Sequence, residues 1–210
     1  MNADAFDQQM IYNMLAQTPG GQQLLLNMAI AGEEDEESLI YSQVNQHIDD
    51  AELKNLSLRH HDDEMRHAKL FRACLDRLGL DCIELPDELR ILRGVHRTGE
   101  YFNGVQSDDD IVNAYAMLFV IEQRGIEDYA LTANAFDPVD PQTAEVYRSI
   151  INDERHHLNV CTTIGTRYAG NEFVWRQAVV KAQRLEALVL QDVGVAAQNY
   201  LVAQKVLIAS

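Results

Sequence analysis

The sequence predicts an all-α fold built on a four-helix bundle, and three observations support this prediction. Only 4 of the 210 residues are proline, and long segments contain no strong helix breaker. Apolar residues recur along these segments at i, i+3, i+4 and i+7, the spacing of one helix face. A Glu-x-x-His motif occurs twice, at residues 64–67 and 154–157. Glu33 precedes the first copy by 31 residues and Glu122 precedes the second by 32, which indicates a repeated helix pair.

The first part of the chain is expected to form a leading helix and then the first bundle helix. Apolar spacing predicts a short helix over residues 4–17, and the Pro and Gly residues of segment 18–21 end it. A longer helix is predicted from about residue 22 to about residue 47. Its apolar stripe carries Glu33 and Glu37 towards the bundle interior.

The second bundle helix is predicted over about residues 50–78, and Gly79 suits the position just after its end. Its inward face carries His60, Glu64 and His67 among apolar residues. Residues 80–108 are rich in turn-forming residues and are expected to hold one or two short helices. A connection of this length is typical of bundles with one long crossover between helices two and three.

The second half of the chain repeats the helix pair and adds a further helix. Acidic residues at the start favour a third bundle helix from about residue 108 to 136, with Glu122 in its apolar stripe. A fourth is predicted over residues 141–169, with Asp140 as its N-cap. A fifth, over residues 172–208, can either cover the bundle or pair with a second subunit.

We therefore expect a single domain over residues 1–210, with the core bundle at 22–169. The formal charge of −16, from 17 basic and 33 acidic residues, makes nucleic acid an unfavourable partner. The apolar runs are too short for a membrane crossing, and the N-terminal residues lack the basic flank of a secretion signal. The three cysteines form no Cys-x-x-Cys motif and indicate reduced thiols, so a cytoplasmic location is expected.

The charged residues inside the apolar stripes predict a dinuclear metal site. Four carboxylates and two imidazoles on inward faces would be very costly to bury without compensating charge. Two divalent cations balance four carboxylates, and bridging glutamates would hold them close together. Ligand sets of oxygen and nitrogen without thiolate favour iron or manganese. The expected cofactor is thus two iron ions, with manganese as the alternative.

The motifs also resemble those of a known superfamily. The run Ala31-Gly32-Glu33 looks like the first-helix ligand motif of rubrerythrins. The run Asp63-Glu64-Met65-Arg66-His67 looks like the Asp-Glu-x-Arg-His motif of bacterial multicomponent monooxygenases and acyl-carrier-protein desaturases. Over residues 22–169 the sequence therefore resembles the ferritin-like di-iron carboxylate superfamily, whose members include rubrerythrins and bacterial di-iron oxidases and oxygenases.

This resemblance implies a role for each residue of the site. It implies that the terminal carboxylates are Glu33 and Glu122 and that the bridging carboxylates are Glu64 and Glu154. It also implies one imidazole for each metal, from His67 and His157. It also implies that Asp63 and Asp153 accept hydrogen bonds from the free ring N–H groups of the ligating histidines. Such a contact fixes the tautomer of a metal-bound imidazole.

Other residues near the ligand face have two interpretations each. Glu37 is either an additional ligand or a partly solvated acid, and Glu34 is an alternative to Glu33 on a more polar face. His60 either points to the site or is a hydrogen-bonded histidine at its boundary. Tyr115 and Tyr129 flank Glu122 by about two turns, and are either redox-active or core tyrosines with satisfied hydroxyls.

Three functional classes are compatible with these features. The first is an enzyme that activates O₂ at a reduced di-iron pair to oxidise or oxygenate a small organic substrate. Gly125, three residues after Glu122, leaves room for that substrate, and the absence of flavin, nucleotide or Cys-x-x-Cys motifs requires an external electron donor. The second is a ferroxidase, peroxidase or manganese catalase on the same ligands. The third is a structural or partner-binding helical protein, with the fifth helix as interface. A homodimer is expected.

Overall fold

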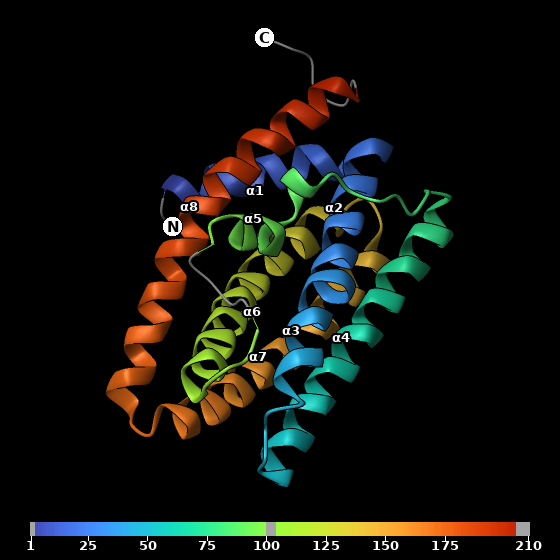
Figure 1. Cartoon of the computed structure of the whole chain (residues 1–210). Helices are drawn as coiled ribbons and strands as arrows, with labels where there is room; N and C mark the ends of the chain where they lie inside the picture. Colours follow the sequence, from blue (N-terminus) through green and yellow to red (C-terminus); the bar gives the residue numbers. More distant parts are fainter. Residues whose placement is uncertain (1–2, 100–103, 205–210) are drawn as a thin grey trace.

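The computed structural model confirms the predicted all-α four-helix bundle with a long crossover (Figure 1). It describes residues 3–99 and 104–204, and within these ranges the side chains of residues 3–7 and 35–39 are not described. The helical elements are α1 (Ala3–Ala16), α2 (Pro19–Ala31), the π-helical turn η1 (Gly32–Glu36), α3 (Glu37–Val44), α4 (Ala51–Leu78), the 3₁₀ turn η2 (Asp87–Leu89), α5 (Ile91–Arg97), α6 (Asp108–Phe136), α7 (Pro141–Ala169) and α8 (Glu172–Ala203).

The first bundle helix differs from its prediction in two ways. It begins at Pro19 and not at residue 22, because Thr18 is its N-cap and accepts a hydrogen bond from the Gly21 backbone N–H at 3.1 Å. Proline at the first helical position has no N–H to leave unsatisfied, so it starts the helix here. The predicted continuous helix is also interrupted by η1 and ends at Val44. Glu33 lies within this π-helical turn.

The bundle is a ring of four helical segments. The first segment, α2 with η1 and α3, packs against α4, and α4 packs against α7. The ring closes because α7 packs along α6 and α6 contacts α3. Asp50 caps α4 by accepting from two backbone N–H groups, and Gly79 ends it in the left-handed conformation, with φ 67°. The crossover contains η2 and α5, as expected from its composition.

Two apolar clusters fill the bundle at its two ends. One gathers around Ile40, Ile111 and Ile164, and the other around Phe71 and Phe136. On α4, α6 and α7 the residues between these clusters are the ones that carry the predicted ligands. The side chains predicted as metal ligands therefore lie in the middle of the bundle.

Helix α8 covers the bundle along α6, with α4 at the opposite side of the view (Figure 1). It crosses α7 so closely that a Cβ on Gly165 would stand 2.1 Å from the Trp175 ring. It also packs on α5, where the side chain of Val189 lies against Gly94. The fifth helix was expected either to cover the bundle or to pair with a second subunit, and in the structure it covers the bundle. The homodimer and the cytoplasmic location stay predictions. In the described parts of the chain, every helix is too short or too polar to cross a membrane.

Candidate metal centre

The six predicted ligands converge between the two apolar clusters. Glu33 comes from η1, Glu122 from α6, and the two Glu-x-x-His pairs from α4 and α7. Each of the six is at most 4 % exposed. Together with one further histidine they form two groups of four, in each of which the ligand atoms lie within 4.8 Å of one another. One group is Glu33, Glu64, His67 and Glu154, and the other is His60, Glu64, Glu122 and His157.

Two glutamates divide their oxygen atoms between the groups. Glu64 Oε1 lies 2.8 Å from His157 Nδ1, whereas its Oε2 lies 3.5 Å from His67 Nδ1. Glu154 Oε2 lies 2.8 Å from His157 Nδ1, whereas its Oε1 lies 3.4 Å from His67 Nδ1. A carboxylate that bridges two cations must present one oxygen to each. The arrangement of Glu64 and Glu154 therefore supports the bridging role that the resemblance implies.

The two aspartates of the repeated motif face the histidines crosswise. Asp153 Oδ2 lies 3.3 Å from His67 Nε2, within hydrogen-bonding distance. Asp63 Oδ2 lies 3.6 Å from His157 Nε2, and this ring nitrogen has no hydrogen-bond partner among the described residues. Both imidazoles therefore turn Nδ1 to the centre and Nε2 to a carboxylate of the other half of the repeat. This is the orientation expected if the aspartates position metal-bound imidazoles.

Arg66 connects the two aspartates, and sequence reasoning assigned it no role. Its Nη2 lies 2.9 Å from Asp63 Oδ1 and 2.9 Å from Asp153 Oδ2. The equivalent residue of the second copy is His156, which is exposed. Only tertiary packing brings Asp153 beside Arg66, so the sequence offered no signal for this contact.

The buried charges perturb one another strongly. Burial raises the pKa of Glu154 to about 8, and the neighbouring Glu122 and Glu64 carboxylates add to the effect. Burial also opposes the charged form of Glu122, but the His60 and His157 side chains outweigh it and lower the pKa of that carboxyl to about 2. Burial lowers the pKa of His157, but its glutamate partners outweigh this and raise it. Without a cation, the cluster balances its charge by sharing protons, and a bound cation would displace them.

The donor set fits two divalent cations. Glu64 Oε1 and Glu154 Oε1 are fully buried, and within the described residues neither accepts a hydrogen bond. Buried carboxylate oxygens without partners are costly, and a cation removes that cost. The donors are carboxylate oxygens and imidazole nitrogens, a combination that suits iron or manganese. The residues present therefore fit the di-iron site that the sequence motifs imply.

The two tyrosines that flank Glu122 in sequence have different surroundings. The Tyr129 hydroxyl donates a very short hydrogen bond to Glu33 Oε1, so this phenol contacts the site. Burial and the nearby Glu33 carboxylate raise the pKa of Tyr129 well above its ordinary value. Tyr115 instead donates to Ser57 Oγ at 2.6 Å and lies outside both groups. For Tyr115 the structure supports the interpretation as a core tyrosine with a satisfied hydroxyl.

The remaining predicted residues are placed as follows. Glu34 forms a very short ion pair with Arg72 on the bundle surface. Of the two alternatives Glu33 and Glu34, the inward residue is therefore Glu33. Glu37 belongs to the residues whose side chains lie outside the described structure. His60 is 1 % exposed and belongs to the group with Glu122, and not to the boundary of the site.

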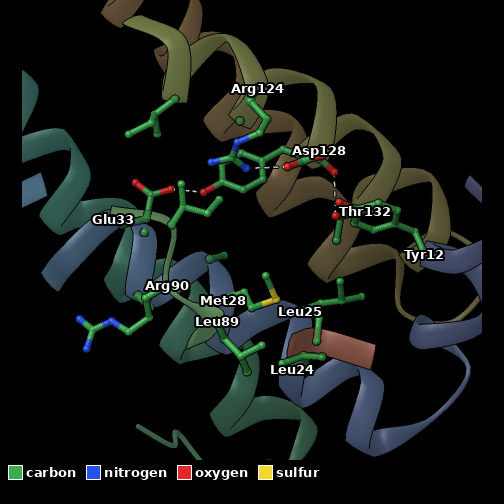
Figure 2. A pocket seen from close by; sticks show the side chains of 18 of the residues that line it. Tyr12, Leu24, Leu25, Met28, Glu33, Leu89, Arg90, Arg124, Asp128 and Thr132 are labelled. Carbon is green, nitrogen blue, oxygen red and sulfur yellow. Dashed lines mark hydrogen bonds and ion pairs between the residues drawn. The ribbon is translucent and has the colours of Figure 1, made fainter. Parts of the chain in front are cut away.

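A cavity of about 600 Å³ adjoins the candidate centre (Figure 2). The four carboxylates contribute to one part of its wall. Most of the rest is apolar and comes from α1, α2, the crossover, α6 and α8; it includes Leu24, Leu25, Met28, Leu92, Ile121 and Leu201. A Cβ placed on Gly125 would have no neighbouring atom within 4 Å. The room predicted beside Glu122 is therefore present.

One half-buried ion-pair network at the cavity wall was not foreseen from the sequence. Arg124 donates from Nε to Glu186 Oε1 at 2.7 Å. It also donates from Nη1 to Asp128 Oδ2 at 2.7 Å, as Figure 2 shows. Thr132 Oγ1 donates to the Asp128 backbone carbonyl at 2.7 Å. Glu186 comes from α8, and its register against α6 cannot be read from helix periodicity. Because the guanidinium has two carboxylate partners, this part of the wall carries no uncompensated positive charge.

Comparison with known proteins gives one match. The model of the rubrerythrin family matches residues 25–162, which include all six predicted ligands and run from α2 into α7. Neither a curated protein nor a solved structure matches the sequence significantly.

Proposed function

Because the chain belongs to the rubrerythrin family, whose ferritin-like domains suggest a di-iron site, we propose that it is an oxidoreductase that oxidises or oxygenates a small organic substrate with O₂. The observation that carries this proposal is the cavity beside the carboxylates. A volume of about 600 Å³ lies within the range of sites that enclose organic ligands. A protein that only oxidises iron has no use for a large apolar chamber at its metal site.

The residues of the chain have separable tasks in this proposal. Glu33, Glu122, Glu64, Glu154, His67 and His157 would hold two iron ions, and when bound these would supply the activation of O₂. Tyr129 holds a proton at the Glu33 oxygen, because its hydroxyl donates there. The apolar side chains of α2 and α6 exclude water and would hold the substrate against Glu33 and Glu122.

The cavity wall also bears on the kind of substrate. Its carboxylates belong to the metal groups or to the Arg124 network, so the accessible surface is mainly aliphatic. We propose a largely apolar, uncharged substrate for this reason. Electrons would come from an external donor, since the motifs of flavin, nucleotide and Cys-x-x-Cys domains are absent from the sequence.

Anaerobic loading followed by exposure to O₂ tests the proposal against iron or peroxide handling. The protein is titrated with Fe²⁺, and O₂ uptake is then followed together with the absorbance of ferric iron. We expect oxidation of two Fe²⁺ per chain and then arrest, with further O₂ uptake only when a reductant is added. Apolar compounds offered with the reductant should appear as oxidised products in mass spectrometry.

Three results would overturn this assignment. Continued oxidation of many Fe²⁺ per chain, with release of ferric iron, would indicate a ferroxidase. Rapid O₂ evolution from hydrogen peroxide by the manganese-loaded protein would indicate a catalase. Failure to retain either metal would remove the proposed function altogether.

A further inference from the structure

The group of donors that contains Glu122 has one more imidazole than the repeated motif accounts for. His60 lies on α4 one turn before Glu64, so that residues 60, 64 and 67 share one face of the helix. The corresponding position before Glu154 is Ile150, a buried aliphatic residue. The two copies therefore differ at this buried position, and the additional nitrogen enters only one of the two groups.

The His60 ring is aimed at the oxygen atoms of the centre. Its Nε2 lies 2.7 Å from Glu122 Oε1 and 3.1 Å from Glu64 Oε1. The ring stacks on the His157 ring with centroids 3.8 Å apart, so both imidazoles approach the same region side by side. Donor atoms bound to one cation at about 2.1 Å stand about 3 to 4 Å apart. The 3.1 Å separation from Glu64 Oε1 matches this spacing, and the 2.7 Å contact with Glu122 Oε1 is a hydrogen bond that a cation would replace.

Hydrogen bonding alone does not account for these contacts. Glu64 Oε1 has two ring nitrogens close by, His60 Nε2 at 3.1 Å and His157 Nδ1 at 2.8 Å. Nevertheless it accepts no hydrogen bond in the described structure, because neither contact has hydrogen-bonding geometry. His60 Nε2 is hydrogen-bonded to Glu122 Oε1. The two imidazole nitrogens and two carboxylate oxygens nevertheless surround a common point, at which Glu64 Oε1 accepts no hydrogen bond. A cation at that point would satisfy all four.

We propose that His60 is a third histidine ligand of the dinuclear centre, at the metal position shared with Glu64, Glu122 and His157. This inference rests on the proposed metal site and adds an asymmetry to it. One position would have two imidazoles, and the position at Glu33 would have only that of His67. The position with more nitrogen donors should bind late first-row divalent cations more tightly, so the two ions should bind in sequence.

Anaerobic titration with Co²⁺ tests the assignment without using activity. The visible absorption of bound Co²⁺ reports the number and type of its donors, and equilibrium dialysis gives the stoichiometry. The wild-type protein should bind two Co²⁺ per chain in two resolved steps. His60→Ala should weaken the tighter step at least tenfold and shift its absorption bands, and added imidazole should restore the bands.

Two further variants separate ligation from simple positioning. The amide of His60→Gln can still donate to Glu122, so a positioning role would leave this variant like the wild type, whereas a ligand role predicts that it behaves like His60→Ala. His156→Ala is the matched control, because His156 is exposed and adjacent to a predicted ligand. Wild-type affinity and spectrum in His60→Gln would overturn the inference and leave the dinuclear site standing. Absence of Co²⁺ binding by the wild type would instead overturn the proposed site itself.

Discussion

Replacement of Gly125 gives a direct test of the cavity, because the structure predicts opposite effects on stability and on ligand binding. Gly125 lies inside α6, and a Cβ at this position would meet no heavy atom within 4 Å. Alanine in a helix interior is favoured over glycine by about 0.8–1 kcal/mol. Gly125→Ala should therefore raise the free energy of unfolding by about 1 kcal/mol while it leaves most of the cavity open.

Gly125→Leu should fill the part of the cavity nearest to Glu122. The leucine side chain adds four carbon atoms, and burial of each against the apolar wall is worth about 0.8 kcal/mol. The gain in stability is thus bounded at about 3 kcal/mol, plus a helix-propensity gain similar to that of alanine. The same atoms occupy space that a ligand needs, so the affinity for an apolar ligand should fall at least tenfold, or by about 1.4 kcal/mol.

Three measurements check this prediction. Urea denaturation of the metal-free variants gives the change in the free energy of unfolding, when this free energy depends on urea concentration with the same slope in each variant. The fluorescence of N-phenyl-1-naphthylamine, a neutral apolar probe, gives the affinity of the cavity. Anaerobic Co²⁺ titration shows whether the metal site is intact, and it should be unchanged in both variants because neither side chain carries a donor atom.

The comparison of the two variants decides the outcome. Gly125→Ala serves as the control for helix propensity, since its single methyl group takes up little of the cavity. Equal probe affinity in the wild type and in Gly125→Leu would show that the chamber is not the binding site. A loss of stability in Gly125→Ala would show that the space beside Glu122 is not open.

Three further predictions concern other parts of the molecule. Gly165→Ala should destabilise the protein by about 1–3 kcal/mol in urea denaturation, because the new Cβ would overlap the Trp175 ring of α8; wild-type stability would contradict this close packing. Asp140 is held by a hydrogen-bonded ion pair with Arg77, which lowers the pKa of its carboxyl. Its contribution to stability is therefore present above the ordinary pKa of an aspartate and is lost as the pH falls through its lower folded value. The wild type should be more stable than Asp140→Asn by about 1 kcal/mol at pH 7, and this difference should shrink as the pH falls below the ordinary pKa of an aspartate; a constant difference would exclude the ionic origin. His157→Ala should bind one Co²⁺ per chain where the wild type binds two, and retention of both ions in dialysis would show that His157 is not a ligand.

The burial of the candidate ligands was predictable because helical phase alone separates inward from outward residues. The phase assigned His157 to the inner face and His156 to the outer one, and the structure has them buried and exposed respectively. Phase also placed Glu64 and Glu154 in the middle of their apolar stripes. These conclusions need no knowledge of how the helices are rotated against each other, since an apolar stripe must face the core whatever its partner.

Features that depend on contacts between helices could not be predicted in this way. The π-helical turn at Glu33 interrupts a helix whose apolar stripe is continuous in the sequence. The stripe therefore gives no indication of the turn. His60 was left with two interpretations, because its partner Glu122 belongs to another helix 62 residues away in the chain. The Arg124–Glu186 pair likewise needs the register of α8 against α6.

The guanidinium of Arg66 connects the buried candidate metal centre to the protein surface. The ligand imidazoles are sealed from solvent, yet the Arg66 side chain is 47 % exposed, and the two aspartates it joins are 36 % and 38 % exposed. Each aspartate faces a histidine of the opposite half. Dissolved ions that screen this rim act on both histidines together, through one shared cation. Salt outside the protein would thus affect both proposed metal positions together, without any solvent molecule entering the bundle.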